Sequence, residues 1–89
     1  MQTTAQKYKA TWDYIPKNTQ KIQAKHMLEN AKKFIIHEIN SLVIFKMTAH
    51  YEVINKESLV VKFFDTEEES LNYCLDRFAG SQKTKQLYI

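Results

Sequence analysis

The stretch LVVKFFDTEEESLNYCLDRFAG, residues 59–80, decides the fold class, because it predicts a short strand that runs directly into a capped amphipathic helix. Alternate side chains in residues 59–64 are apolar on one face, which is the pattern of a strand packed on a core. Thr66 and Glu69 match a capping box, and the glutamates at 67–69 place negative charge at the positive end of the helix dipole.

The helix in this stretch has an apolar stripe and a stop signal. Leu71, Cys74, Leu75 and Phe78 recur at helical spacing and predict the buried face. Gly80, which is the chain's single glycine, follows this stripe at the position where a left-handed helix cap is favoured.

Upstream of this unit, the pattern predicts a strand, a long helix and a second pair of strands. Residues 7–15 alternate, and Pro16 ends the predicted strand; its inner face would be Tyr8, Ala10, Trp12 and Tyr14. A helix capped by Asn18 or Thr19 should then extend to about Asn40, with an apolar side made of Ala24, Met27, Leu28, Ala31, Phe34, Ile35 and Ile39.

Residues 42–54 are rich in strand-forming side chains, and residues 55–57 read as a hairpin turn into the strand at Leu59. Residues 83–89 are compatible with a last strand or with a loose tail. The predicted order is therefore β-α-β-β-α-β in a single α+β domain, residues 1–89. This is the ferredoxin-like arrangement, a four-stranded antiparallel sheet with two helices on one face.

Three segments resemble an RNA-recognition-motif domain at the level of pattern: TWDYIPKNT as its first strand and loop, VVKFFDTEEESLNYCLDRFAG as its third strand and second helix, and QLYI as its fourth strand. The resemblance implies the ferredoxin-like fold. The family's three base-stacking aromatic positions correspond here to Thr11, Ser58 and Val60, so the resemblance argues against base-specific RNA reading.

The composition narrows the functional classes. The net charge is +3, and lysines make up all but one of the thirteen cationic residues, which favours diffuse attraction to an anionic polymer over bidentate recognition. One cysteine excludes an intrachain disulfide framework. The sequence shows no apolar run long enough for a membrane span and no secretory signal, so we expect a cytoplasmic protein without membrane association.

The predicted open face of the sheet is basic. It could bind RNA or another single-stranded nucleic acid with little sequence preference, as a small regulatory protein would. Alternatively, its lysines would simply keep a solvated face soluble and discourage edge pairing. The candidate nucleic-acid-binding residues are Lys7, Lys9, Lys46, His50, Lys62, Phe64 and Tyr88.

The same predicted face carries Ile44, Val60 and Phe64, which is more apolar surface than a solvated sheet needs. These three residues are candidate interface positions for a protein partner, in which case the chain would be an interaction or inhibitor module. They would also allow two sheets to pack back to back, and we expect a homodimer.

Neither catalysis nor metal binding is expected. Cys74 is predicted to be buried, and a single glycine cannot form a phosphate-cradling loop. His26 and His37 lie about 16 Å apart along the predicted helix and cannot share a metal. The acidic residues at 65–69 are explained by helix capping, so no cofactor and no metal are predicted.

Overall fold

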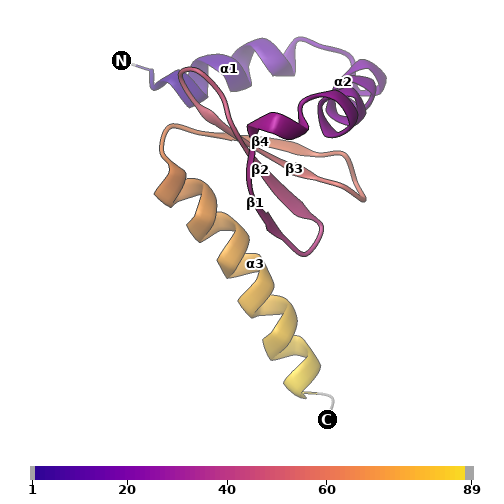
Figure 1. Ribbon diagram of the computed structural model, residues 1–89, viewed down its shortest axis with the longest axis vertical. Helices are drawn as coiled ribbons and strands as arrows, with labels where there is room; N and C mark the ends of the chain where they lie inside the picture. Colours follow the sequence, from indigo (N-terminus) through magenta and orange to yellow (C-terminus); the bar gives the residue numbers. More distant parts are fainter. Residues whose placement is uncertain (1, 88–89) are drawn as a thin grey trace.

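The computed structural model describes the backbone of residues 2–87 and the side chains of residues 2–78. Two helices, a four-stranded antiparallel sheet and a long final helix follow one another along the chain (Figure 1). A single 3-10 turn, η1, leads into the sheet. The elements are α1 (Thr4–Asp13), α2 (Lys17–Asn30), η1 (Lys32–Phe34), β1 (Ile35–Ile39), β2 (Leu42–Lys46), β3 (Tyr51–Asn55), β4 (Val61–Phe64) and α3 (Glu67–Leu87).

The sheet is a simple meander in which each strand pairs with the next, in the order β1-β2-β3-β4. The α+β class and the four-stranded antiparallel sheet are therefore confirmed. The order of elements along the chain differs from the predicted β-α-β-β-α-β, because two helices precede the first strand and three helices are present. Short turns join all four strands, which is the local connectivity that antiparallel pairs permit.

The first difference lies in the segment predicted as a strand, residues 7–15, most of which belongs to α1. The side chain of Thr3 accepts the backbone N–H of Gln6, and the Gln6 side chain accepts the N–H of Thr3, so a capping box starts this helix. Ala5, Tyr8 and Trp12 are spaced three and four residues apart, and they lie on the helix face toward the sheet. The alternating aromatic pattern thus also satisfies a helical period.

The second difference concerns the predicted helix up to about Asn40. Helix α2 ends at Asn30, and the residues that follow form η1 and then β1. Ile35, Ile36 and Ile39 are β-branched residues that pack better on a pleated surface, and β1 pairs with β2 from Ile35↔Phe45 to Ile39↔Leu42. Strand pairing therefore overrides a helical pattern that the sequence also allows.

The strand predicted for residues 42–54 is divided into β2 and β3 by a tight turn, in which the N–H of Met47 donates to the carbonyl of His50 at 2.9 Å. The predicted turn after Asn55 is confirmed. The Asn55 side chain accepts the N–H groups of Glu57 and Ser58, an arrangement typical of an Asx turn.

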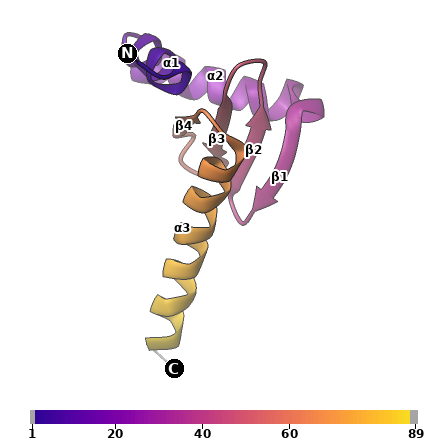
Figure 2. The same cartoon turned by 90° about the vertical axis from the view of Figure 1, so that its left-hand side faces the viewer.

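The two faces of the sheet bury separate apolar clusters. Helix α2 covers one face, where Ala24 and Ala31 pack against Val43, Phe45 and Ile54. Helix α3 covers the opposite face, so the prediction that both helices lie on one face of the sheet was wrong (Figures 1 and 2). The residues of this second cluster include Leu42, Ile44, Val53 and Cys74.

Covering both faces overturns the predicted open sheet face. Ile44 has no exposed surface and belongs to the core under α3. It therefore cannot serve as an interface residue, and back-to-back packing of two sheets through this face is blocked by α3. The alternation of strand residues does not reveal this, because the same apolar pattern suits a face covered by a partner or by the chain's own helix.

Helix α3 starts as predicted but ends later. The Thr66 hydroxyl accepts the N–H of Glu69 at 3.2 Å, which confirms the predicted cap. Of the predicted stripe, Cys74 is buried, whereas Leu75 is about half exposed. The helix continues through Gly80 to Leu87 and projects past the sheet, so no strand forms at residues 83–87 (Figure 1). Residues 88–89 lie outside the described part of the chain.

Candidate nucleic-acid interface

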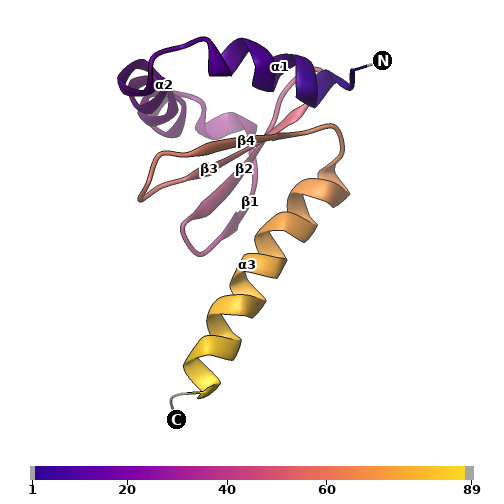
Figure 3. The same ribbon diagram turned by 180° about the vertical axis from the view of Figure 1, so that it is seen from behind.

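A groove of about 690 Å³ runs along β4, which forms one edge of the sheet. Figure 3 shows β4 between α1 and α2 on one side and α3 on the other. The floor of the groove is the strand and the loop before it, and each wall is helical. Its lining consists of Lys9, Trp12, Asp13, Lys17, Gln20, Lys21, Ser58, Leu59, Val60, Val61, Lys62, Phe63, Phe64, Tyr73 and Arg77.

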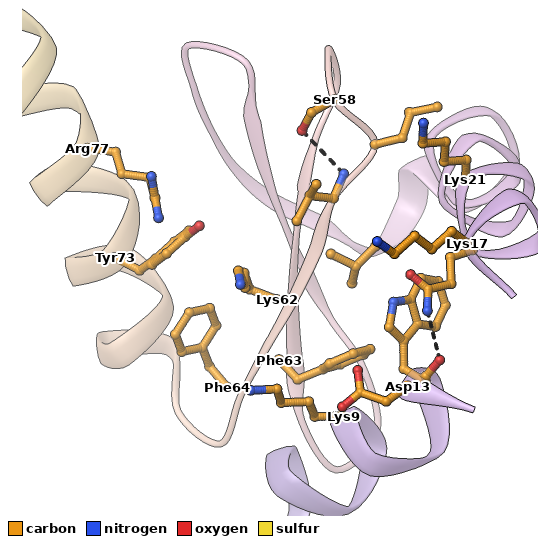
Figure 4. Close-up of a pocket in the computed structure, with 15 residues that line it drawn as sticks. Lys9, Asp13, Lys17, Lys21, Ser58, Lys62, Phe63, Phe64, Tyr73 and Arg77 are labelled. Atoms are coloured by element: carbon orange, nitrogen blue, oxygen red, sulfur yellow. Dashed lines mark hydrogen bonds between the residues drawn. The ribbon is translucent and has the colours of Figure 1, made fainter. Parts of the chain in front are cut away.

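The groove is strongly basic, with five cationic side chains in its lining and one acidic side chain, Asp13. In Figure 4, Lys17 and Lys21 lie on the α2 side, Arg77 lies on the α3 side, and Lys62 lies between them on β4. Lysines on separate elements, facing a common hollow, attract an extended anion more strongly than the same charges spread over a surface.

Aromatic side chains lie between these cations. Phe64 and Tyr73 are in contact, with ring centroids 5.3 Å apart, and the Arg77 guanidinium lies over the Tyr73 ring at 4.5 Å. On the other wall Trp12 meets Phe63 edge to face at 5.8 Å. These rings are half-buried, so packing fixes their positions while part of each surface remains available for stacking.

The corner between α1 and α2 is held by a single amide side chain. Gln20 Nε2 donates to the carbonyls of Trp12 and Ile15, at 3.0 and 2.9 Å. The Trp12 carbonyl, in the last turn of α1, also accepts the N–H of Ile15 at 2.9 Å, and Ile15 follows the C-cap of the helix. Gln20 therefore fixes the angle at which α1 and its Lys9 side chain approach the groove.

Three of the residues predicted for nucleic-acid binding lie together in this groove: Lys9, Lys62 and Phe64. Lys7 and Lys46 are exposed but do not line it, because Lys7 lies on another face of α1 and Lys46 at the far end of β2. Tyr88 lies outside the described residues. Of the predicted interface residues, Val60 is 50% exposed and lines the groove together with Phe64.

His50 is not an exposed sheet residue as the alternation predicted. It lies in the turn before β3, is only 6% exposed, and stacks on Tyr8 with 3.9 Å between ring centroids. The turn at residues 47–50 interrupts the alternation on which its predicted orientation depended. His50 therefore belongs to the packing between α1 and the sheet and not to the groove.

The predicted site residues do not include Lys17, Lys21, Tyr73 and Arg77, which line the groove from α2 and α3. The spacing of Tyr73 and Arg77 was a usable signal, since residues four apart on a helix share a face. Lys17 and Lys21 are also four residues apart on one helix, but their approach to β4 depends on the angle between α1 and α2.

The nucleophilic and metal-ligating groups of the described residues are sparse near the groove. Burial raises the pKa of the Cys74 thiol, and the Arg77 guanidinium opposes this to a smaller extent. Cys74 is thus held as a neutral thiol inside the core. Within residues 2–87 no group of three or more histidine, cysteine or acidic side chains is placed to hold a metal ion.

Among the same described residues, none of the helices combines the length and the apolar character needed to cross a bilayer.

Comparison with known proteins returned no family model, no curated protein and no solved structure that matches this chain. The functional argument therefore starts from the groove itself.

Proposed function

We propose that this protein binds single-stranded nucleic acid, RNA in particular, through the groove along β4, with low sequence specificity and without catalysing a reaction. The observation that carries the proposal is the placement of five cationic side chains from four elements around one hollow that also holds aromatic rings. Such a combination tracks a phosphate backbone and stacks bases without reading their edges. Such a protein would regulate the nucleic acid simply by covering it.

Several features favour a single strand over a duplex. The groove is lined on both walls, by α1 and α2 opposite α3, so its floor suits an extended chain. A duplex keeps its bases stacked on each other, whereas Tyr73 and Phe64 would stack on the bases of an unpaired strand.

The cationic residues favour low sequence specificity. Twelve of the thirteen are lysines, which neutralise phosphates as point charges and do not select a base.

The test is fluorescence anisotropy with a labelled single-stranded RNA of about 12 nucleotides, a length within the usual range for small binding modules. Between about 50 and 200 mM salt, contact with about three to five phosphates should give a log-log slope of about −2 to −3.5. A duplex of the same sequence should bind more weakly. Absence of salt-dependent binding at low salt would overturn the proposal.

Charge reversal locates the binding surface. Lys17→Glu combined with Lys62→Glu should weaken binding at least about tenfold, since both side chains line the groove. Lys7→Glu combined with Lys46→Glu is the matched control, because it makes the same change in net charge at two exposed lysines outside the groove. Equal losses in the two proteins would point to diffuse charge and would reject the groove as the site.

A second candidate function is docking of a protein, and the edge position of β4 favours it. An extended segment with apolar side chains could add a strand to this edge, with those side chains near Val60 and Phe64. Phe64→Ala should then reduce binding of the protein partner more than Lys62→Glu does, whereas the nucleic-acid function predicts the reverse order. The predicted homodimer would also have to use this edge or another exposed surface, because Ile44 is buried.

A further inference from the structure

A second cavity, of about 540 Å³, lies between α1, α2 and the turn that joins β2 to β3. Its volume falls within the range of pockets that bind small molecules, and its walls are mostly apolar or aromatic. The lining consists of Tyr8, Trp12, Ile22, Gln23, His26, Met27, Met47, Thr48, His50 and Glu52.

Two polar side chains of this cavity, His50 and Glu52, lie side by side, and His50 is buried. His50 is 6% exposed, and within the described part of the chain neither of its ring nitrogens has a hydrogen-bond partner. Its Nε2 lies 3.3 Å from a carboxylate oxygen of Glu52, whose side chain is 15% exposed. No lysine or arginine of the described residues forms an ion pair with Glu52.

The His50 ring requires an explanation, because each unsatisfied buried polar group costs about 1–3 kcal/mol and native structures contain few of them. A group that enters the cavity and donates hydrogen bonds would give a partner to the Glu52 carboxylate and to the acceptor nitrogen of the His50 ring. The buried His50 nitrogens without hydrogen bonds, next to a carboxylate that no described lysine or arginine pairs with, therefore indicate a ligand with N–H donors.

The charge of the cavity indicates the sign of that ligand. Glu52 is the one formally charged residue in its lining when histidine is neutral, in contrast to the lysine-rich groove along β4. Tyr8 and Trp12 add aromatic faces, which attract organic cations through the ring quadrupole. A basic protein thus carries one cavity whose lining favours a cation.

We propose that this cavity binds a small aromatic or apolar amine. Its ammonium group pairs with the Glu52 carboxylate and donates a second hydrogen bond to His50 Nε2 after a small rotation of the imidazole ring. Its apolar body lies between Tyr8, Trp12 and Met27. This site is separate from the proposed nucleic-acid groove and does not depend on it, although Trp12 borders both.

Isothermal titration calorimetry with phenethylamine, compared with 2-phenylethanol, tests the proposal on the intact protein. The two probes share an apolar body, and only phenethylamine carries a charge. We expect phenethylamine to bind at least tenfold more tightly, and amide signals of Tyr8, His50 and Glu52 to shift in NMR spectra as it binds. No binding at about 10 mM, or equal affinities for the two probes, would overturn the proposal.

Three variants locate the site. Glu52→Gln keeps the shape of the side chain and should abolish the preference for the charged probe. Met47→Trp should fill the cavity and remove binding of both probes, which provides an independent test if Glu52→Gln fails to fold. Lys62 lines the groove along β4 and does not line this cavity, so Lys62→Glu should leave the affinity for phenethylamine unchanged. If phenethylamine binds folded Glu52→Gln or folded Met47→Trp as tightly as the unchanged protein, the amine binds elsewhere and the proposed site is rejected.

Discussion

Leu59 shows how a single residue can hold an unfavourable backbone conformation when its side chain is packed. Its φ is 61°, in the left-handed region, which costs a residue with a Cβ atom about 1–2 kcal/mol. Its N–H donates to the carbonyl of Asn55 at 2.8 Å and closes the loop before β4. The side chain packs against the cluster under α2, and this burial offsets the backbone strain.

This balance predicts that Leu59→Gly is more stable than Leu59→Ala, which reverses the usual order of the two substitutions. Leu59→Ala should cost about 2–3 kcal/mol, because it removes the packing and keeps the strained φ. Leu59→Gly removes the same packing but relieves the strain, so it should be about 0.5–1 kcal/mol more stable than Leu59→Ala. Urea unfolding of both variants measures the difference.

Val60, the exposed neighbour of Leu59, is the control position for this pair. Its φ is not positive, so Val60→Gly should be less stable than Val60→Ala, which is the usual order. The account of Leu59 is wrong if alanine proves better than glycine at both positions.

At the level of single side chains, part of the candidate site could be predicted from the sequence. The strand predicted at residues 59–64 begins two residues later, at Val61, because Leu59 has a positive φ. Lys62 and Phe64 lie within both the predicted strand and β4, and they lie in the groove. Lys9 also lies there, although it was assigned to a strand and belongs to a helix. His50 could not be placed, since a single turn at residues 47–50 changes which direction a side chain faces.

At the level of elements, the predicted helix cap formed as expected, whereas the periodic spacing of apolar residues assigned residues 7–15 to the wrong kind of element. The cap at Thr66 depends on residues three apart and formed as predicted. The segment at residues 7–15 satisfies both period 2 and period 3.6, and tertiary packing of Trp12 on β4 and of Tyr8 on the turn between β2 and β3 selects the helix. A sequence pattern that fits two periods cannot choose between them without the surface on which it packs.

Helix α1 packs along β4, and one of the interactions that attach it is a hydrogen bond to a charged carboxylate. The N–H of Ala5, in the first turn of α1, donates to the Asp65 carboxylate at 2.8 Å. This carboxylate occupies the positive end of the helix dipole. Aromatic contacts from Tyr8 and Trp12 complete the attachment.

Asp65→Ala should therefore loosen α1 without unfolding the sheet. Loss of the charged acceptor leaves the Ala5 N–H without its partner, at a local cost of about 1–3 kcal/mol. Hydrogen exchange should accelerate at least about tenfold in residues 5–13, while amides in β2 and β3 keep their protection. Equal acceleration in β2 would show that α1 and the sheet unfold together and would contradict this account.

At the level of the whole molecule, the groove is assembled from parts that lie far apart in the sequence. Lys9 comes from α1, Lys62 from β4 and Arg77 from α3, and β4 holds the two walls at its sides. The sequence separates a basic first part, with seven lysines and three acidic residues up to residue 40, from a nearly neutral remainder. The fold, and not this sequence distribution, brings the cations to one place.

This assembly gives a prediction in which net charge and groove geometry disagree. Asp65→Ala raises the net charge by one unit, so diffuse attraction alone would strengthen RNA binding. If Lys9 and Trp12 must be positioned by a docked α1, the same variant should weaken binding about threefold to tenfold, although Asp65 does not line the groove. Glu29→Ala makes the same charge change on the exposed side of α2 and should slightly strengthen binding. Anisotropy titrations of both variants at one salt concentration distinguish the outcomes: tighter binding by both would reject a positioned groove, and opposite changes would support it.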